Sequence, residues 1–406
     1  MIPIHYNTRN LFVRWRPTLL TALCFMLVVA LLVVMLAFVQ GLNELSKKSG
    51  PEGNVMILRD GATDELFSDL ADNVNLSKLW LHPEVLPHLQ GPNEKMASRE
   101  VYSIATQELP PKKEGDRPTY RFLQVRGVED PEVAGAVHGL TLKAGRWLGR
   151  DGNEIVLGEG IARTLGLEIG NEFEARKPLS WRVVGIMDSK GSPFDSEIWA
   201  KREEVGRNFG KDNNTPGQEQ RFFTSVVVQT PNAATAQKFS EVLQDRQKDI
   251  RVNVLPERRY YEAMSESNQM FQVAALFIAI IMAIGGMFGL MNTMFAAVSQ
   301  RIKDIGVLRI VGFRRWQILA SFMLESLLLA IIGGGLGIAI GYLVNGIEQV
   351  GFMSAGQGGG KTVVFNMLVN KQVIITAAVF TLVMGLFGGF LPAFAAMRQR
   401  PLEALR

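Results

Sequence analysis

Cysteine is almost absent from this chain of 406 residues, and histidine is scarce. The only cysteine, Cys24, lies inside a long apolar run, so disulfides cannot stabilise a folded domain, which must depend on an ordinary hydrophobic core. The four histidines, His5, His82, His88 and His138, show no metal-ligand spacing such as HExxH. His82 and His88 flank prolines in a loop-like stretch, which favours a surface role. We therefore predict no metal site and no bound cofactor.

Catalytic and nucleic-acid-binding patterns are absent as well. No GxSxG nucleophile elbow occurs, and no serine or aspartate stands in a recognisable catalytic setting. The formal net charge is only +4, and the basic residues cluster beside apolar segments instead of forming a stripe of their own. These absences predict that the chain is not itself an enzyme and has no nucleic-acid partner.

Four long apolar runs are present, and they predict four membrane-spanning helices. The first, 18–39, is uncharged over 22 residues. As a helix it would be about 33 Å long, enough to cross the hydrocarbon core. A cleavable signal peptide would have a shorter apolar region and a small-x-small cleavage site, so we interpret this run as an uncleaved anchor. The runs 271–299 and 372–397 carry no charge, and 316–345 carries only Glu325.

Glycines inside these runs indicate close helix packing in lipid. Gly285 and Gly289, and also Gly337 and Gly341, have the small-xxx-small spacing. Packing within one bundle and contact between two subunits both remain open.

Lysine and arginine in the short segments predict the orientation. Three basic segments would lie on one side of a four-span chain, whereas the loop 346–371 on the other side has only Lys361 and Lys371. Both termini are therefore expected in the cytoplasm of a bacterium, with the chain crossing its inner membrane. The basic residues are Arg9, Arg14, Arg16, Arg301, Lys303, Arg309, Arg314, Arg315, Arg398, Arg400 and Arg406. The predicted order is a cytoplasmic N-terminus (1–17), a first span (18–40), an extracytoplasmic domain (41–270), a second span (271–299), a cytoplasmic loop (300–315), a third span (316–345), an extracytoplasmic loop (346–371), a fourth span (372–397) and a cytoplasmic tail (398–406).

The segment between the first two spans is long enough for a folded domain. Short β-rich runs at 54–58, 121–128, 154–157, 181–186 and 225–230 alternate with helical stretches at 159–167 and 233–245. The fold class predicted is a membrane α-helical bundle, one helix plus three, with an inserted α+β extracytoplasmic domain. The flanking segments 41–48 and 258–269 could extend the first two spans outward as a stalk.

A phosphate-loop pattern, AGQGGGKT at 355–362, is interpreted as a decoy. Such a loop needs a strand before it and a helix after it, so that backbone N–H groups face the phosphates. Here a span precedes Gly360, Lys361 and Thr362, and a strand-like VVFN follows them. We predict a flexible glycine-rich connector that does not bind ATP.

The loop after the second span carries the most informative pattern, SQRIKDIGVLRIVG at 299–312. With FMLES at 322–326, GFLPA at 389–393 and PLEALR at 401–406, it resembles the FtsX-like permease family, whose members include the MacB exporter and the LolC/LolE lipoprotein-releasing subunits. The family loop reads R-x-x-E-I-G-x-x-R-A-x-G, and Asp304 and Ile310 replace its Glu and Ala. The stretch 145–186 also resembles the MacB-type periplasmic core.

The resemblance implies that this loop is a coupling helix that docks on a separate ATPase subunit. Ile302, Ile305, Leu308 and Val311 recur at helical spacing and predict one apolar face. The same pattern permits a helix lying on anionic lipid. The predicted coupling residues are Arg301, Ile302, Asp304, Ile305, Gly306, Arg309 and Gly312. The arginines and Asp304 would make polar contacts, and the glycines would allow close approach or end the helix.

Two polar residues inside the spans, Glu325 and Asn292, are expected to have a structural or functional role. A charge is costly in lipid. A proton relay would need further acids, and the other spans have none. We therefore expect Glu325 to hydrogen-bond within the bundle or near the cytoplasmic face.

The resemblance implies the permease subunit of a MacB-like ABC export system, which transmits ATP-driven motion to its outer domain. Its expected partners are a separate cytoplasmic ABC ATPase that binds the ATP, a second copy in a homodimer, a periplasmic adaptor or membrane-fusion protein, and the lipid bilayer. An FtsX-like regulator of cell-wall hydrolases and a LolC/LolE-like subunit remain the alternatives.

Overall fold

The computed structural model describes residues 15–47, 49–88, 91–109, 119–149, 152–176, 179–213, 220–246, 251–353 and 361–398. Its contacts divide the chain into two compact units. One contains residues 1–41, 270–347 and 366–406, and the other contains residues 42–269 and 348–365. The basic N-terminal segment, His5, most of the glycine-rich stretch with Gly360, and the tail after Arg398 lie outside the described residues.

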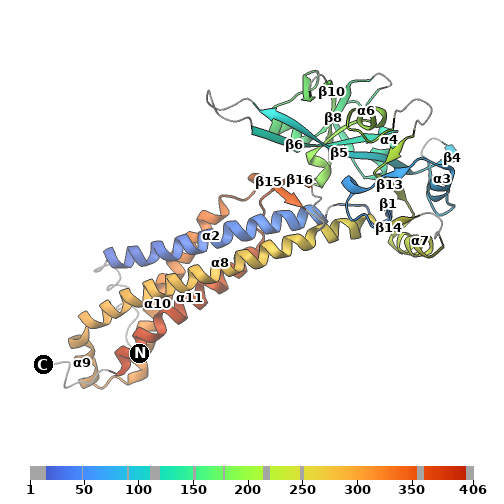
Figure 1. Cartoon of the computed structure of the whole chain (residues 1–406). Helices are drawn as coiled ribbons and strands as arrows, with labels where there is room; N and C mark the ends of the chain where they lie inside the picture. Colours follow the sequence, from blue (N-terminus) through green and yellow to red (C-terminus); the bar gives the residue numbers. More distant parts are fainter. Residues whose placement is uncertain are drawn as a thin grey trace. The chain divides into compact units, whose positions relative to one another are not determined.

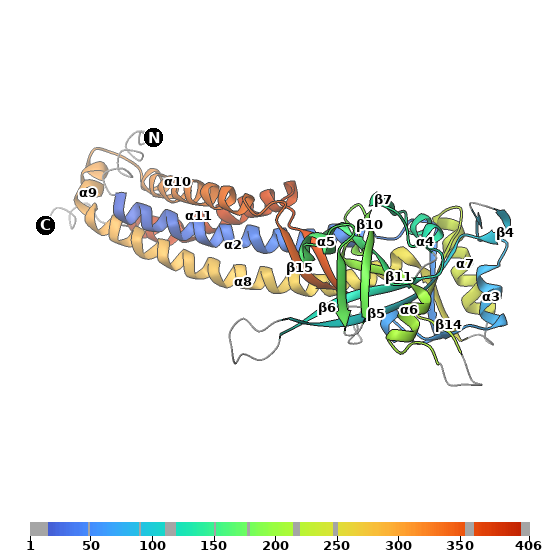
Figure 2. The same cartoon turned by 90° about the horizontal axis from the view of Figure 1, so that it is seen from above.

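The first unit is a helical bundle. Its long helices are α2 (Trp15–Lys47), α8 (Glu257–Gln300), α10 (Arg315–Tyr342) and α11 (Lys371–Arg398), with the short α9 (Ile302–Ile310) between α8 and α10. The long helices lie side by side in both views (Figures 1 and 2). Each contains a stretch long and apolar enough to span a membrane: Thr18–Leu45, Gln272–Gln300, Arg315–Tyr342 and Lys371–Arg398. The prediction of four spans is confirmed.

Glycines bring the bundle helices close together. A Cβ at Gly337 would lie 2.7 Å from the Met26 carbonyl oxygen, and one at Gly341 would lie 2.6 Å from Val33 Cβ, so α10 packs directly on α2. Cβ atoms at Gly285 and Gly289 would meet no described atom within 4 Å. The two glycine pairs therefore differ: the α10 pair packs within the bundle, and the α8 pair does not.

The second unit is built on one large mixed sheet. The strand order is β14-β1-β13-β5-β6-β11-β8-β10-β7, and β9 pairs with β10. Strands β11 and β6, and also β10 and β8, are parallel, whereas the other described pairings are antiparallel. The strands are β1 (Asn54–Arg59), β5 (Ala97–Leu109), β6 (Thr119–Val128), β7 (Thr141–Gly145), β8 (Glu154–Gly158), β9 (Glu172–Arg176), β10 (Leu179–Asp188), β11 (Glu197–Lys201), β13 (Ser225–Gln229) and β14 (Val252–Pro256).

Short helices and small strand pairs complete this unit. The helices are α3 (Val74–Trp80), α4 (Pro131–Val137), α5 (Glu159–Leu165), α6 (Arg202–Asn208) and α7 (Ala233–Arg246), with 3-10 turns η1 (Glu65–Phe67) and η2 (Pro193–Ser196). The pairs are β2 (Leu70–Ala71) with β12 (Phe222–Phe223), β3 (Pro87–His88) with β4 (Gly91–Lys95), and β15 (Glu348–Met353) with β16 (Lys361–Asn366). The mixed α and β character predicted for this domain is confirmed.

Alternating apolar residues place the core on both faces of the sheet. Ile155 and Leu157 of β8 belong to one apolar cluster, whereas Val156 between them belongs to another together with Trp199 of β11. Because successive side chains of a strand point to opposite faces, continuous apolar runs such as SVVVQ are buried on both sides.

Candidate functional site

The short helix α9 exposes apolar side chains. Ile305 is buried in the bundle core, and Ile302 and Leu308 are half-buried, as the predicted apolar face requires. Val311, assigned to the same face, is 71% exposed, and Ile310 is 61% exposed. Val307 is also exposed. The prediction of a single apolar face is therefore wrong, because one side packs on the bundle and a second apolar patch remains uncovered.

Glycine ends α9, as the sequence predicts. Gly312 has φ +104°, a backbone conformation that glycine adopts without strain. The following amide, Phe313 N–H, donates to the Leu308 carbonyl at 3.1 Å and closes the helix end. Gly306 is buried on the side that faces the bundle.

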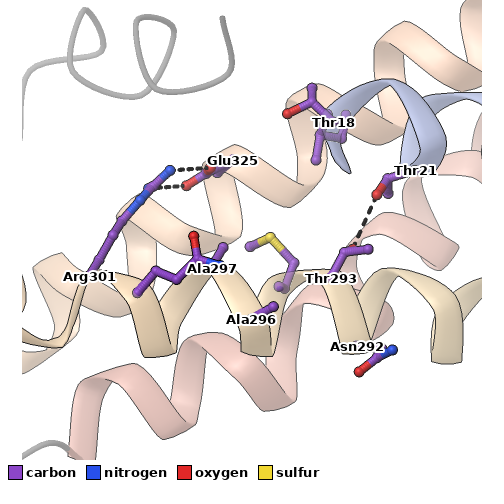
Figure 3. A pocket seen from close by; sticks show the side chains of 11 residues that line it. Thr18, Thr21, Asn292, Thr293, Ala296, Ala297, Arg301 and Glu325 are labelled. Atoms are coloured by element: carbon purple, nitrogen blue, oxygen red, sulfur yellow. Dashed lines mark hydrogen bonds and ion pairs between the residues drawn. The ribbon is translucent and has the colours of Figure 1, made fainter. Parts of the chain in front are cut away.

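Arg301 points into the bundle and pairs with Glu325. Its Nη1 donates to Glu325 Oε2 at 3.0 Å and its Nη2 to Oε1 at 3.2 Å (Figure 3). Both side chains are only 7% exposed. The expected hydrogen bond of Glu325 within the bundle is confirmed, because a buried carboxylate requires a partner and Arg301 supplies it. The coupling role predicted for Arg301 stays a prediction.

The other polar residues of α9 differ in exposure. Asp304 is exposed and free to contact another molecule. Arg309 is half-buried, and its Nη1 donates to the Phe313 carbonyl at 3.2 Å, so part of its role is to hold the end of α9.

A pocket of about 200 Å³ lies beside the Arg301–Glu325 pair. It is lined by α2, α8 and α10, and Thr21 Oγ1 donates to Thr293 Oγ1 across it at 3.1 Å (Figure 3). Asn292 also lines it and is exposed. The structure thus brings Arg301, Asn292 and Glu325 to one pocket, which the spacing in the sequence does not indicate.

Lys361 of the phosphate-loop pattern is buried in the second unit. It is the first residue of β16, and its side chain is 0% exposed. Its Nζ donates to Glu65 Oε2 at 2.5 Å and lies 3.8 Å from Glu197 Oε1. The prediction of a flexible connector is wrong for this flank, because 361–366 form a strand with a buried ion pair. Thr362 lies in the same strand, and its side chain is outside the described set.

Seven charged residues, Lys361 among them, form a buried ion cluster. Its members are Glu65, Glu100, Arg126, His138, Glu197, Glu257 and Lys361, which come from seven different elements or caps. Arg126 is its centre: Nε donates to Glu197 Oε2 at 2.6 Å, Nη1 donates to Glu65 Oε1 at 2.8 Å, and Nη1 also contacts Glu100. Multiple partners are what a buried charge needs.

His138 joins the cluster to the first residue of α8. Its Nε2 lies 2.6 Å from Glu100 Oε1, and its Nδ1 lies 3.1 Å from Glu257 Oε1. Burial by itself would lower the pKa of His138, but Glu100 and Glu257 outweigh that effect and raise it to about 10. Burial would raise the pKa of Glu100, whereas His138 and Arg126 lower it to about 2. The imidazole is therefore a cation at neutral pH.

Comparison with known proteins decides the family. Residues 18–246 match the MacB-like periplasmic core domain, and residues 276–401 match the FtsX-like permease C-terminal domain. The chain belongs to the MacB-like family of ABC transporter permeases. The predicted resemblance is confirmed, and the match to the periplasmic core covers residues 18–246, far beyond the stretch 145–186.

The relatives of this MacB-like permease include both permeases and larger proteins. An uncharacterised ABC transporter permease of Methanocaldococcus jannaschii is 27% identical over 280 residues, which is 66% of each chain. The macrolide export ATP-binding/permease protein MacB of Shewanella oneidensis is 32% identical over 236 residues, which is 55% of this chain and 33% of that protein. The crystal structure of the periplasmic region of MacB from Actinobacillus actinomycetemcomitans matches with a TM-score of 0.35 and 14% identity, covering 55% of this chain and 97% of that one. The matches thus cover a third to two thirds of the length of the two sequence relatives.

Sequence reasoning missed the buried ion cluster of this MacB-like permease. A signal was present, because Arg126 and Glu197 interrupt strand-like runs (RFLQVRGV and EIWAK) whose neighbours are apolar. A charge in a run buried on both faces needs a partner. The sequence does not say which of the 39 acidic residues that partner is.

The charge on His138 predicts that the second unit (residues 42–269 and 348–365, the outer domain) loses stability as the pH becomes alkaline. Its pKa rises from 6.5 unfolded to about 10 folded, so the stabilisation is complete below pH 6.5 and is lost as the pH rises through 10. Thermal unfolding followed by tryptophan fluorescence should show stability falling from pH 6.5 to 9.5, with a slope approaching about 1.4 kcal/mol per pH unit. His138→Gln should be less stable at pH 6 and should remove most of this slope. An unchanged slope would show that His138 is not the titrating group.

Proposed function

We propose that this chain is the permease subunit of a MacB-like export system, driven by a separate ATPase subunit that docks on α9. The observation that carries the proposal is the uncovered apolar patch of α9 (Val307, Ile310 and Val311) next to the exposed Asp304. The opposite side of the same helix is fixed to the bundle by Ile305 and by the Arg301–Glu325 pair. A helix that offers one side to a partner and is held by the other suits a coupling element.

The basic residues around α9 support the proposal that this helix lies in the cytoplasm. Arg301, Lys303, Arg309, Arg314 and Arg315 surround the helix, and the positive-inside rule favours the cytoplasmic side of the bacterial inner membrane for them. Both termini then lie in the cytoplasm, and the domain from Leu42 to Gln269 lies outside it. In this proposal the partner subunit binds and hydrolyses the ATP.

We propose a homodimer that contacts along α8. Gly285 and Gly289 leave space that no described residue fills, and the amide of Asn292 is exposed on the same helix. An exposed amide is costly in lipid, and a second copy could both satisfy it and pack on the glycines.

More than half of the chain matches the MacB-like core, and this match favours export. The alternatives are a regulator of cell-wall hydrolases and a lipoprotein-releasing subunit. MacB relatives are named for macrolide export. A periplasmic adaptor would be a further partner of the outer domain.

The docking proposal predicts that negative charge on the uncovered patch abolishes coupling. Val307→Asp with Ile310→Asp should reduce the ATP turnover of the purified complex by at least about tenfold, because two desolvated carboxylates would replace apolar contacts. The measurement is ATP hydrolysis and co-purification of the ATPase subunit with the tagged permease.

The control is Val242→Asp on α7, which places one added carboxylate at an exposed apolar position of the other unit. It should leave co-purification and ATP turnover near the wild-type values. If the α9 variant still binds and stimulates the ATPase, the patch is not the docking surface. If it instead loses only binding to anionic vesicles, α9 is a lipid-binding helix.

A further inference from the structure

The loop between the third and fourth spans folds as part of the outer domain. Residues 348–365 belong to the same compact unit as residues 42–269. Val363 is fully buried, Phe365 is 5% exposed, and Val364 N–H donates to Ser196 Oγ. Only residues 343–347 separate α10 from β15, and only 367–370 separate β16 from α11. The β15–β16 hairpin is therefore a short covalent link from two spans to the outer domain.

The site that holds Lys361 is suited to an ammonium group. Its Nζ has Glu65 at 2.5 Å and Glu197 at 3.8 Å. The rings of Tyr102, Tyr260 and Tyr261 surround it, with Nζ 4.6, 5.6 and 5.5 Å from their centroids. Two carboxylates and three aromatic faces around one buried cation are more than hairpin packing alone requires.

Charge balance explains why the cluster needs this lysine. Glu65, Glu100, Glu197 and Glu257 face only two other cations of the cluster, Arg126 and protonated His138. Without Lys361, four buried carboxylates would share two positive charges. Leaving a buried charge without its partner is strongly destabilising.

We propose that Lys361 is a positioning residue that pins the β15–β16 hairpin into the outer domain, so that α10 and α11 move this domain together with the α2 and α8 stalks. The pin is local: it holds the hairpin, whereas the large sheet is held by its own apolar clusters. The role in motion rests on the proposed function, and the pin itself does not.

Hydrogen exchange of the full chain in detergent tests the pin without any ATPase. In Lys361→Met, the amides of β15 and β16 should exchange at least about tenfold faster, while those of β8 and β10, which carry no residue of the ion cluster, should keep their protection. Arg163→Gln is the matched control, since it removes the ion pair of Arg163 with Glu348 on the same hairpin, whose side chains are 52% and 33% exposed. It should change exchange little.

A double variant distinguishes loss of the ion pair from general misfolding of the domain. Lys361→Met with Glu65→Gln removes one charge of each sign and should restore part of the hairpin protection. Wild-type protection of the hairpin in Lys361→Met would overturn the pin. The pin would also be overturned if Lys361→Met lost protection equally in the hairpin and in the sheet, and if the double variant recovered none of it.

The role in motion has its own readout. In the complex with the co-purifying ATPase, adding ATP should alter exchange in the wild-type outer domain, and Lys361→Met should lose that response while still binding the ATPase. A preserved response would overturn the role in motion and leave the pin intact. If no ATPase binds the wild-type chain, the proposed function fails, and the exchange result on the hairpin still stands.

Discussion

Replacing Arg126 with methionine is expected to unfold the outer domain. The guanidinium is 1% exposed and contacts Glu65, Glu100 and Glu197 at once. Methionine fills a similar volume but leaves three buried carboxylates without their shared partner. Breaking one buried ion pair costs about 3–5 kcal/mol, which is a large part of the stability of a typical domain.

Thermal unfolding followed by tryptophan fluorescence measures this loss, because Trp181 and Trp199 are buried in the same unit. Arg126→Lys should also be strongly destabilised, since an ammonium cannot reproduce the forked contacts. The matched control is Arg182→Met on strand β10, whose partner Glu172 is 3.9 Å away and whose side chain is 66% exposed. It should change the melting temperature little. A small effect of Arg126→Met would mean that the carboxylates are neutralised in another way.

Replacing Glu325 with leucine is expected to disrupt the bundle and the seating of α9. The substitution leaves the buried Arg301 guanidinium without its bidentate partner. Removing one partner of a buried ion pair costs about 3–5 kcal/mol, because the other charge stays buried without compensation. We expect a marked loss of thermal stability and of ATP turnover in the complex with the ATPase.

The double variant Glu325→Leu with Arg301→Met separates burial from coupling. It removes both charges and should recover most of the thermal stability, because an apolar pair of similar volume is often tolerated in place of a buried ion pair. If ATP turnover recovers with stability, the pair serves only the fold. If stability recovers and turnover does not, the pair transmits motion between α9 and α10. Lys303→Gln, at an exposed position of α9, is the control and should affect neither.

Local sequence was enough to predict the four spans and half of the strands of the large sheet. These depend on local composition: 22 uncharged residues between 18 and 39 must cross a membrane, and runs such as SVVVQ must be buried as strands. Of the two roles that the sequence left open for Gly312, close approach or helix end, the structure shows the second, since Gly312 has a positive φ just after α9. The coupling pattern was readable from local sequence too, since nearly all of it lies in 14 consecutive residues, 299–312.

The partners of the charged side chains became clear only from the folded structure. Arg301 and Asp304 stand three residues apart, yet one is buried against Glu325 and the other is exposed. Lys361 and Glu65 are separated by 296 residues and form a buried pair. A hydrophobic pattern indicates which face of an element is buried, but the partner of a buried charge is fixed by the geometry of elements distant in the chain.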